Sequence, residues 1–362
     1  MSTLGYHSRD YTNFLNQYVF KLGNDLYYMN ILVTGGAGYI GSHTVKQLVD
    51  AGHHVVVLDN FYSGHRWAVD PAAVLVEGDI ADTKCVDQVL KEHNIDSVVH
   101  FAGYIVVPES VSDPFKYYEN NVVGSLRLIE VCERNNVSRF VFSSSAAVYG
   151  LPDGQQVSED TPLKPINPYG NSKLITEMTL NDVAAAYQSK NTPFNFVALR
   201  YFNAAGAQTA GNLGQATPEA THLIKVACEA ATGKRAQMKI FGTDYDTPDG
   251  TCVRDYIHVE DLASAHLGAL DYLADGGDSI RLNCGYGQGY SVKEVVAMVK
   301  KVSSVDFDVI EADRRPGDPP SLIADNTQIK NLLGWTPKND DLELICRTAF
   351  NWEKHWQAQS SG

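Results

Sequence analysis

The residues of this chain best suited to do chemistry are Tyr169 and Lys173, four positions apart, and Ser145 upstream of them. On a helix, residues four apart share a face, so the phenol and the ammonium would point the same way. A free tyrosine has a pKa of about 10, and a nearby positive charge favours its phenolate. These groups predict oxidation of an alcohol: a base removes the hydroxyl proton while a hydride leaves the carbon that bears the hydroxyl. The alternative for Tyr169 and Lys173 is an ordinary surface pair.

A glycine-rich turn stands far upstream of this group. Residues 34–41 read TGGAGYIG, follow an apolar run at 30–33 and precede a helical pattern at 39–51. This order is typical of a dinucleotide-binding turn, where glycines let the backbone approach a pyrophosphate at a helix N-terminus. The alternative is a tight turn without a ligand. The turn and the tyrosine together predict a bound nicotinamide dinucleotide.

Asp59 indicates which dinucleotide, because it ends the second apolar run roughly twenty residues further on. A carboxylate there would accept hydrogen bonds from ribose hydroxyls and repel a 2′-phosphate, which favours NAD over NADP. The alternative is a residue that caps its own loop. Asp79 and Ile80 follow the third run and would lie beside the adenine, or else simply form a turn.

The first half of the chain alternates short apolar runs with helical patterns. Strands are expected at 30–33, 54–58, 73–77, 97–101, 139–143 and 194–200, and helices at 39–51, 83–93, 114–135 and 169–187. Continuous apolar runs between helices are typical of parallel strands covered on both faces. We expect an α/β fold: a doubly wound parallel Rossmann sheet with a smaller C-terminal α/β substrate domain.

The second half is less regular. Long loops are expected at 206–218 and 242–250 and helices at 219–232, 260–273 and 292–302, the last begun by a capping box from Ser291 to Glu294. We expect a cofactor domain at 29–203 and a substrate domain at 204–362, with segments returning to the main sheet. Residues 1–28 are expected to be an extension outside the fold, with Met29 as the natural start; the alternative is a real N-terminal arm.

Composition limits the partners. The 362 residues include 43 acidic and 29 basic side chains, a formal net charge of −14, which argues against a nucleic-acid or anionic membrane surface. A run of apolar residues long enough to span a membrane is absent from the sequence. Six scattered cysteines without a Cys-x-x-Cys pair argue against a zinc site or a disulfide framework and favour a reducing cytoplasm.

Further motifs make the chain resemble the extended short-chain dehydrogenase/reductase family. They are the glycine turn, Asp59-Asn60, the segments 77–80 (EGDI), 100–103 (HFAG), 143–146 (SSSA) and 168–170 (PYG) with Lys173, and 200–203 (RYFN). Two more, 253–259 (VRDYIHV) and 314–318 (RRPGD), narrow the resemblance to the UDP-glucose 4-epimerase family. It runs from Met29 to near Trp352.

The resemblance implies roles for individual residues. Catalysis would fall to Ser145, Tyr169 and Lys173. NAD would be held by Gly35, Gly38, Tyr39, Ile40, Gly41, Asp59, Asn60, Asp79, Ile80, Phe101, Ala102, Gly103, Asn121, Tyr169, Lys173, Tyr201 and Phe202. The UDP sugar would be held by Ser145, Tyr169, Asn203, Phe241, Arg254, Arg315, Asp318 and Ser321. From the residues alone, Arg254 and Arg315 could equally form surface ion pairs.

The implied function is reversible epimerisation of UDP-glucose and UDP-galactose at C4′ through a 4-keto intermediate, with NAD held throughout. Ala146 and Ala147 follow the serine where 4,6-dehydratases need an acidic pair, which argues against elimination. A 4-epimerase of a UDP-uronate or UDP-pentose remains open, as does a non-catalytic NAD sensor. Retention of the serine, tyrosine and lysine argues against the sensor.

Three positions depart from the family pattern. Ile105 stands where many members have a lysine that contacts the cofactor, so NAD would be held less tightly unless another group substitutes. Asn171 stands where lysine is common, with no clear consequence. Ser321 replaces a bulky tyrosine of some members, which would leave room for UDP-N-acetylglucosamine unless Leu322 fills the space.

The resemblance also implies a homodimer. The helical segments 114–135 and 169–187 would pack with their mates as a four-helix bundle. Val122, Leu126, Ile129 and Val131 supply apolar surface for it, or else belong to the core of one chain.

Overall fold

A seven-stranded parallel sheet forms the centre of the computed structural model, which describes residues 28–188, 194–217, 220–315 and 317–360. Its strands are β1 (Asn30–Thr34), β2 (His54–Asp59), β3 (Val74–Glu77), β4 (Ser97–His100), β5 (Arg139–Ser143), β7 (Asn195–Tyr201) and β11 (Ile280–Cys284). Their order is β11-β7-β5-β4-β1-β2-β3, and every neighbouring pair is parallel. The predicted doubly wound α/β class is confirmed.

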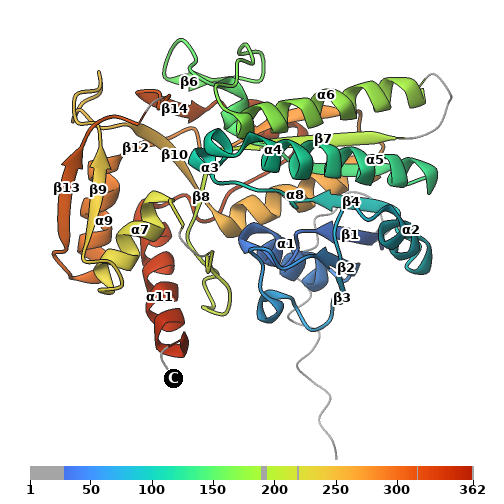
Figure 1. Ribbon diagram of the computed structural model, residues 1–362, viewed down its shortest axis with the longest axis horizontal. Helices are drawn as coiled ribbons and strands as arrows, with labels where there is room; N and C mark the ends of the chain where they lie inside the picture. The colour runs from blue at the N-terminus through green and yellow to red at the C-terminus, as the bar shows by residue number, and fades with distance from the viewer. Residues whose placement is uncertain (1–27, 189–193, 218–219, 316, 361–362) are drawn as a thin grey trace, which may run out of the picture.

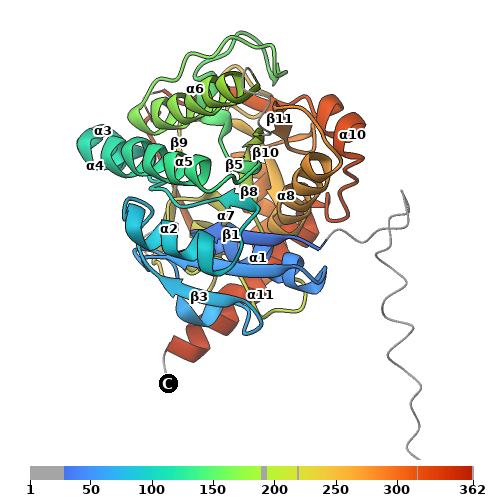
Figure 2. The ribbon, with the colours of Figure 1, turned by 90° about the vertical axis from the view of Figure 1, so that its right-hand side faces the viewer.

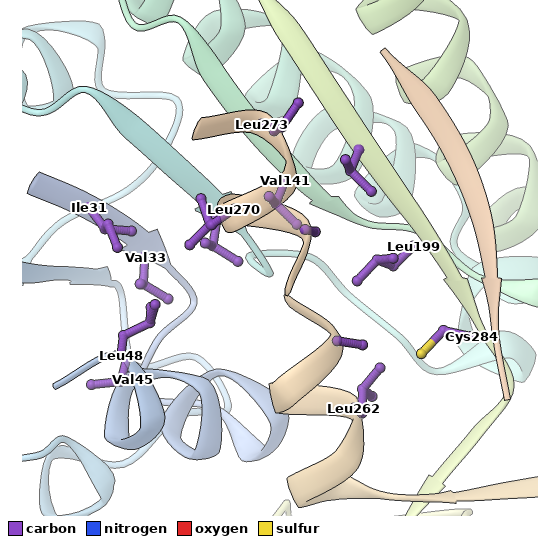
Figure 3. Close-up of a cluster of buried hydrophobic side chains, with 14 of the residues drawn as sticks. Ile31, Val33, Val45, Leu48, Val141, Leu199, Leu262, Leu270, Leu273 and Cys284 are labelled. Atoms are coloured by element: carbon purple, nitrogen blue, oxygen red, sulfur yellow. The ribbon is translucent and has the colours of Figure 1, made fainter. Parts of the chain in front are cut away.

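Helices cover both faces of this sheet (Figure 2). One face carries α1 (Tyr39–Asp50) and α8 (Val259–Ala274), and the other carries α2 (Thr83–Glu92), α5 (Ser125–Arg134) and α6 (Pro168–Gln188). Successive strand residues serve opposite faces: Ile31 and Val33 join the α1–α8 core, and Leu32 joins the α2–α5–α6 core. Figure 3 shows the first of these cores. Burial on both faces explains why the strands read as continuous apolar runs.

The helix expected at 114–135 has three parts. It begins as α4 (Pro114–Tyr117), continues through a π-helical segment η3 (Tyr118–Gly124) and ends as α5. A short helix, α3 (Val107–Ser112), precedes it and was not predicted. Within η3, the backbone carbonyl of Asn121 accepts hydrogen bonds from the hydroxyls of Ser125 and Thr176. The Thr176 contact ties the wide turn to α6, and such π segments are frequent at functional sites.

The C-terminal half builds a second group of elements on the left of Figure 1. A five-stranded sheet holds β12 (Gly289–Ser291), β10 (Val253–His258), β14 (Ser321–Ala324), β6 (Gln156–Val157) and β8 (Asn203–Ala205), and β9 (Gln237–Phe241) pairs with β13 (Asp308–Ala312). The helices here are α7 (Leu223–Ala231), α9 (Val292–Ser303) and α11 (Leu342–Ser360), whereas α10 (Thr327–Leu333) packs against α8 and β11 of the main sheet. The capping box of Ser291 and Glu294 begins α9 as predicted.

Three details bear on the predictions from sequence. All six cysteines are free thiols, and five of them are buried. None of the helices in the described part of the chain is long and apolar enough to cross a membrane. The expected extension lies outside the described residues apart from Tyr28, which is exposed.

Candidate active site

The glycine turn lies between β1 and α1, at the carboxyl edge of the main sheet. Gly35 has a φ of +71°, and a Cβ there would stand 2.7 Å from the backbone nitrogen of Ala102. A Cβ on Gly41 would collide with the carbonyl oxygen of Gly35. Gly38 caps α1 without a capping side chain, so the first amides of the helix are left to bind an anionic group.

Asp59 ends β2 beside this turn. Its carboxylate accepts hydrogen bonds from the backbone N–H groups of Ala37 at 2.9 Å and Phe61 at 2.8 Å. Burial raises the pKa of Asp59, while these two hydrogen bonds lower it. The carboxylate therefore links the glycine turn to the loop after β2, and it also lines the large cavity described below. The contacts support the loop-capping alternative and leave the ribose-binding role open to the same side chain.

Ser145 and Tyr169 meet at the carboxyl end of β5. Ser145 is the N-cap of the short helix η4 (Ala146–Tyr149), and its hydroxyl oxygen accepts a hydrogen bond from the N–H of Ala147 at 3.2 Å. Tyr169 is the second residue of α6, whose start is fixed by Asn167: the Asn167 side-chain oxygen accepts from Gly170 N–H at 2.8 Å. The Ser145 hydroxyl acts to lower the pKa of the Tyr169 phenol, and both side chains line the large cavity described below. The fold therefore brings Ser145 and Tyr169 to the same place, and their catalytic roles stay a prediction.

Lys173 lies one turn along α6 and is 4% exposed. Its ammonium donates to the carbonyl oxygen of Ser143 at 2.8 Å and stands 5.9 Å from the centre of the Tyr169 ring. Burial lowers the pKa of Lys173 to about 8, and the carboxylate of Glu177 raises it. Burial also raises the pKa of Tyr169, and its hydrogen bond to Ser145 lowers it. In the chain alone, desolvation thus dominates the tyrosine pKa.

A buried ion pair behind these groups was not predicted. Arg200 on β7 and Glu177 on α6 are each 2% exposed and joined at 2.6 Å. Arg200 also donates to the Tyr149 hydroxyl at 3.1 Å, and the Ser144 hydroxyl donates to Glu177. The network therefore braces the residue next to Ser145 and the helix that carries Tyr169 and Lys173. Its sequence signal was the spacing of Glu177, four residues beyond Lys173 on the same helix face.

The predicted substrate residues gather where β9, β10 and the segment before β14 meet. The Arg315 guanidinium lies 3.9 Å from the centre of the Phe241 ring. Arg254 stands 3.6 Å from the carboxylate of Asp318 and is 12% exposed at its side chain. Two guanidinium groups in one cavity, one of them over an aromatic ring, suit a nucleoside diphosphate, because arginine binds phosphates through paired N–H donors. The surface ion-pair alternative for Arg254 is partly right, since Asp318 is its partner.

One cavity of about 1600 Å³ connects these groups. It exceeds the roughly 300–1,000 Å³ of a typical small-molecule pocket, so it has room for two ligands. Most predicted site residues line it: Gly35, Gly38, Tyr39, Ile40, Gly41, Asp59, Asn60, Ile80, Phe101, Ala102, Gly103, Ser145, Tyr169, Tyr201, Phe202, Asn203, Phe241, Arg254, Arg315 and Asp318.

Four predicted residues lie outside the cavity lining. The Asp79 carboxylate accepts from Asn60 at 2.9 Å and from Ala81 N–H at 2.8 Å, as the turn alternative predicts. Asn121 exchanges hydrogen bonds with the backbone of Tyr104 behind the wall of the cavity. Lys173 lies behind Gly103, where a Cβ would stand 3.7 Å from its ammonium nitrogen. These three residues support the lining from behind it, and their contact with a cofactor stays a prediction.

Ser321 is the fourth. It is 6% exposed, its hydroxyl lies 3.4 Å from the Gln155 carbonyl oxygen, and its neighbour Leu322 lines the cavity instead. Sequence reasoning missed several lining residues, among them Tyr62, Tyr104, Leu151 and Ile166. They lie in loops, where no periodicity or motif distinguishes them.

The cavity fits a dinucleotide at one end. Close approach of the backbone at Gly35 and Gly41, the uncapped amides of α1 and the buried carboxylate of Asp59 all meet there. A doubly wound sheet with such a turn beside a serine, a tyrosine and a lysine defines the class of dinucleotide-dependent enzymes of the short-chain dehydrogenase type.

The chain belongs to the NAD-dependent epimerase/dehydratase family, whose model matches residues 31–285. It is 55% identical over 324 residues to the UDP-glucose 4-epimerase of Azospirillum brasilense, covering 90% of this chain and 92% of that one. A solved structure of the UDP-Glc/GlcNAc 4-epimerase from Campylobacter jejuni is 52% identical, with a TM-score of 0.79, covering 90% and 99% of the two chains. UDP-glucose 4-epimerase from Bifidobacterium longum in complex with NAD⁺ and UDP is 38% identical, with a TM-score of 0.84, covering 90% and 98%.

Proposed function

We propose that this protein is an NAD-dependent UDP-sugar 4-epimerase that interconverts UDP-glucose and UDP-galactose. The observation that carries the proposal is the single cavity that joins the glycine turn, the Ser145–Tyr169 pair and the two guanidinium groups of Arg254 and Arg315. The end of the cavity suited to a cofactor and the end suited to a nucleoside diphosphate meet at Ser145 and Tyr169. The UDP-glucose 4-epimerase relatives, one described with NAD⁺ and UDP, support the same assignment.

Tyr169 is the base in this proposal. Its phenolate oxygen removes the proton of the sugar 4′-hydroxyl, and the Ser145 hydroxyl hydrogen-bonds to the reacting oxygens. Lys173, held by the Ser143 carbonyl, keeps a positive charge near the phenolate. After the 4-keto sugar rotates, Tyr169 returns the proton to the oxygen at C4′ with the opposite configuration.

NAD⁺, when bound, supplies the acceptor for the C4′ hydride and its source for the return. The glycine turn and the start of α1 would hold its pyrophosphate, Asp59 a ribose, and Ile80 the adenine. Phe101, Ala102, Gly103, Tyr201 and Phe202 would enclose the nicotinamide end. We propose residues 29–203 as the cofactor domain and 204–362 as the substrate domain, although β11 lies in the main sheet and β6 in the second one.

The UDP sugar occupies the other end. Arg254 and Arg315 bind its diphosphate, Asp318 its uridine ribose and Phe241 its uracil, with Asn203 near the sugar. Binding would require the Arg254–Asp318 contact at 3.6 Å to open or to share its donors. A UDP-uronate or UDP-pentose remains the alternative substrate.

A second activity, on UDP-N-acetylglucosamine, is favoured by one observation. The UDP-Glc/GlcNAc 4-epimerase of Campylobacter jejuni is 52% identical to this chain. Against this activity, Leu322 lines the cavity where the small Ser321 side chain does not.

The protein is further proposed to be a homodimer in the cytoplasm. Phe115, Leu126, Ile175 and Met178 are exposed on α4, α5 and α6, which run side by side in Figure 1. Of the residues named for this surface from sequence, Ile129 and Val131 are instead buried in the chain's own core. Free cysteines fit a reducing compartment. Light scattering should give a dimer, and Phe115→Glu should give a monomer.

The test is an assay of purified protein with UDP-galactose, with and without added NAD, followed by NMR. Formation of UDP-glucose is expected in at least the NAD-supplemented sample. Activity only with another UDP sugar would favour the alternative substrate, and NAD binding without any turnover would favour the sensor.

A further inference from the structure

A cluster of aromatic and charged side chains lies at the rim of the cavity, beyond the residues assigned above. The rings of Tyr62 and Tyr104 meet edge to face with centres 4.6 Å apart. The Lys116 ammonium lies 4.9 Å from the Tyr62 ring centre and 4.7 Å from the Tyr104 ring centre. It also donates to the Tyr62 hydroxyl at 2.7 Å and pairs with Glu109 at 2.5 Å. We refer to Tyr62, Tyr104 and Lys116 as the rim latch.

The rim latch spans the glycine turn. Tyr62 follows β2 and Tyr104 follows β4, whereas β1 and its glycine turn lie between those two strands in the sheet. Both rings line the cavity, and Lys116 lies behind them, outside its lining. A contact between the loops after β2 and β4 therefore bridges the place where the glycine turn would bind a pyrophosphate.

Both loops are anchored independently of the latch. The N–H of Tyr62 donates to the Asn60 side chain at 3.0 Å, and Phe61 before it holds a φ of +56°, which is unusual for a residue with a side chain. The N–H of Tyr104 donates to the Asn121 side chain at 2.8 Å. Tyr117 fixes Glu109 by donating to its carboxylate at 2.9 Å. Lys116 thus contacts both of these anchored loops from α4.

Ile105 gives the latch its significance. The family resemblance implies a lysine toward the cofactor at this position, whereas the apolar side chain of Ile105 lines the cavity here. Lys116 brings an ammonium to the same loop from α4, and it acts through two rings that enclose the cavity.

We propose that Lys116, by clamping Tyr62 against Tyr104, closes the cavity over the pyrophosphate of bound NAD and slows its release in place of a lysine at position 105. This inference rests on the proposed function, because it takes NAD as the ligand of the glycine turn. Lys116 is a positioning residue that retains the cofactor and takes no part in proton transfer.

The test measures the rate at which NAD leaves the protein. Parent and Lys116→Met proteins are loaded with isotope-labelled NAD and chased with excess unlabelled NAD, and the retained label is followed after desalting. Methionine keeps the length of the side chain and removes the charge. Loss of two cation–π contacts and a hydrogen bond should speed NAD release about tenfold. The matched control is Lys91→Met, which removes an exposed lysine paired with Asp87 on α2 and should leave the rate unchanged.

Tyr62→Phe keeps the ring and removes the hydroxyl that Lys116 contacts, so it should speed release by a smaller factor, about threefold. It also serves if Lys116→Met does not fold. Release rates of the folded variants within twofold of the parent overturn the inference and leave the proposed function intact. A loss of thermal stability in the cofactor-free protein with an unchanged release rate does the same, because it assigns Lys116 a structural role alone. Failure of the parent to bind NAD overturns both.

Discussion

The two ends of the cavity are built in different ways. The cofactor end is made of the backbone of the glycine turn and of buried side chains. Asp59 ends β2, and Lys173 lies on α6 with the buried Glu177–Arg200 pair behind it. The substrate end is made of more exposed side chains from separate segments, such as Arg254, Arg315 and Asp318. The cofactor end is therefore preorganised, while the substrate end has to exchange partners as ligands come and go.

The largest effect is expected at the point where the two ends meet. Tyr169→Phe removes the proton acceptor and keeps the ring, so kcat should fall about a thousandfold. NAD content should stay at the parent level, since the glycine turn is untouched. Turnover is measured by NMR and bound NAD by chromatography. If the variant kept a kcat close to that of the parent, Tyr169 would not be the catalytic base.

The next effect concerns stability. Glu177→Gln leaves Arg200 buried and unpaired at the cofactor end and should cost about 3–5 kcal/mol of unfolding free energy. Asp318→Asn breaks the partly exposed pair at the substrate end and should cost at most about 1 kcal/mol. Denaturant unfolding of cofactor-free protein compares the two. Equal costs would contradict the contrast between the ends.

Lys173 should give the cofactor end a pH-dependent stability. Its pKa in the folded chain is about 8, against an ordinary 10.5, so between these values the unfolded chain binds more protons and folding stability rises with pH. Lys173→Met removes this contribution. The unfolding free energy of the variant minus that of the parent should therefore be larger below pH 8 than at pH 10.5, by on the order of 3 kcal/mol. Denaturant unfolding of both proteins at the two pH values measures the change, and a constant difference would refute it.

At the substrate end, Arg254→Met should act on affinity. Loss of a charge-assisted contact to the diphosphate should raise KM about 10- to 100-fold. The NAD release rate should not change. Steady-state kinetics and the label chase test this, and a variant that lost NAD and kept its KM would place Arg254 at the wrong end.

The smallest effect concerns selectivity. Ser321→Tyr should lower kcat/KM for UDP-N-acetylglucosamine relative to UDP-galactose by about tenfold, because the ring would take space near Leu322. A Ser321→Ala control should leave the ratio as it is. If the ratio of the two kcat/KM values is unchanged in the tyrosine variant, Ser321 does not determine which sugar is accepted, which would agree with its place outside the cavity lining.

The difference between the two ends also explains what the sequence predicted. The glycine turn, Asp59 and the Tyr169–Lys173 spacing are local patterns attached to apolar strands, and the structure places them as expected apart from the cover over Lys173. Strands β6, β8, β12 and β14 of the second sheet were missed because each has only two to four residues and their partners lie far away in sequence, as for β6 and β14. Helix α11 was missed although Ile345, Cys346 and Trp352 are buried on it. Arg254 and Arg315 came from the family resemblance, since nothing local in the sequence shows that they line the same cavity.

The rim latch shows the same limit. Lys116 lies on α4, eleven residues beyond the unexpected Ile105, and only the fold brings it against Tyr62. A departure from a motif was visible in the sequence, whereas the side chain that offsets it was not.

In the proposed reaction, the hydride that leaves C4′ of the sugar returns to the same carbon within one cavity. UDP-galactose carrying deuterium at C4 of the sugar, incubated with the purified protein and NAD, tests it most directly. We expect UDP-glucose that keeps the deuterium at C4, with no exchange into solvent. UDP-glucose without the label, or no UDP-glucose at all, would contradict it.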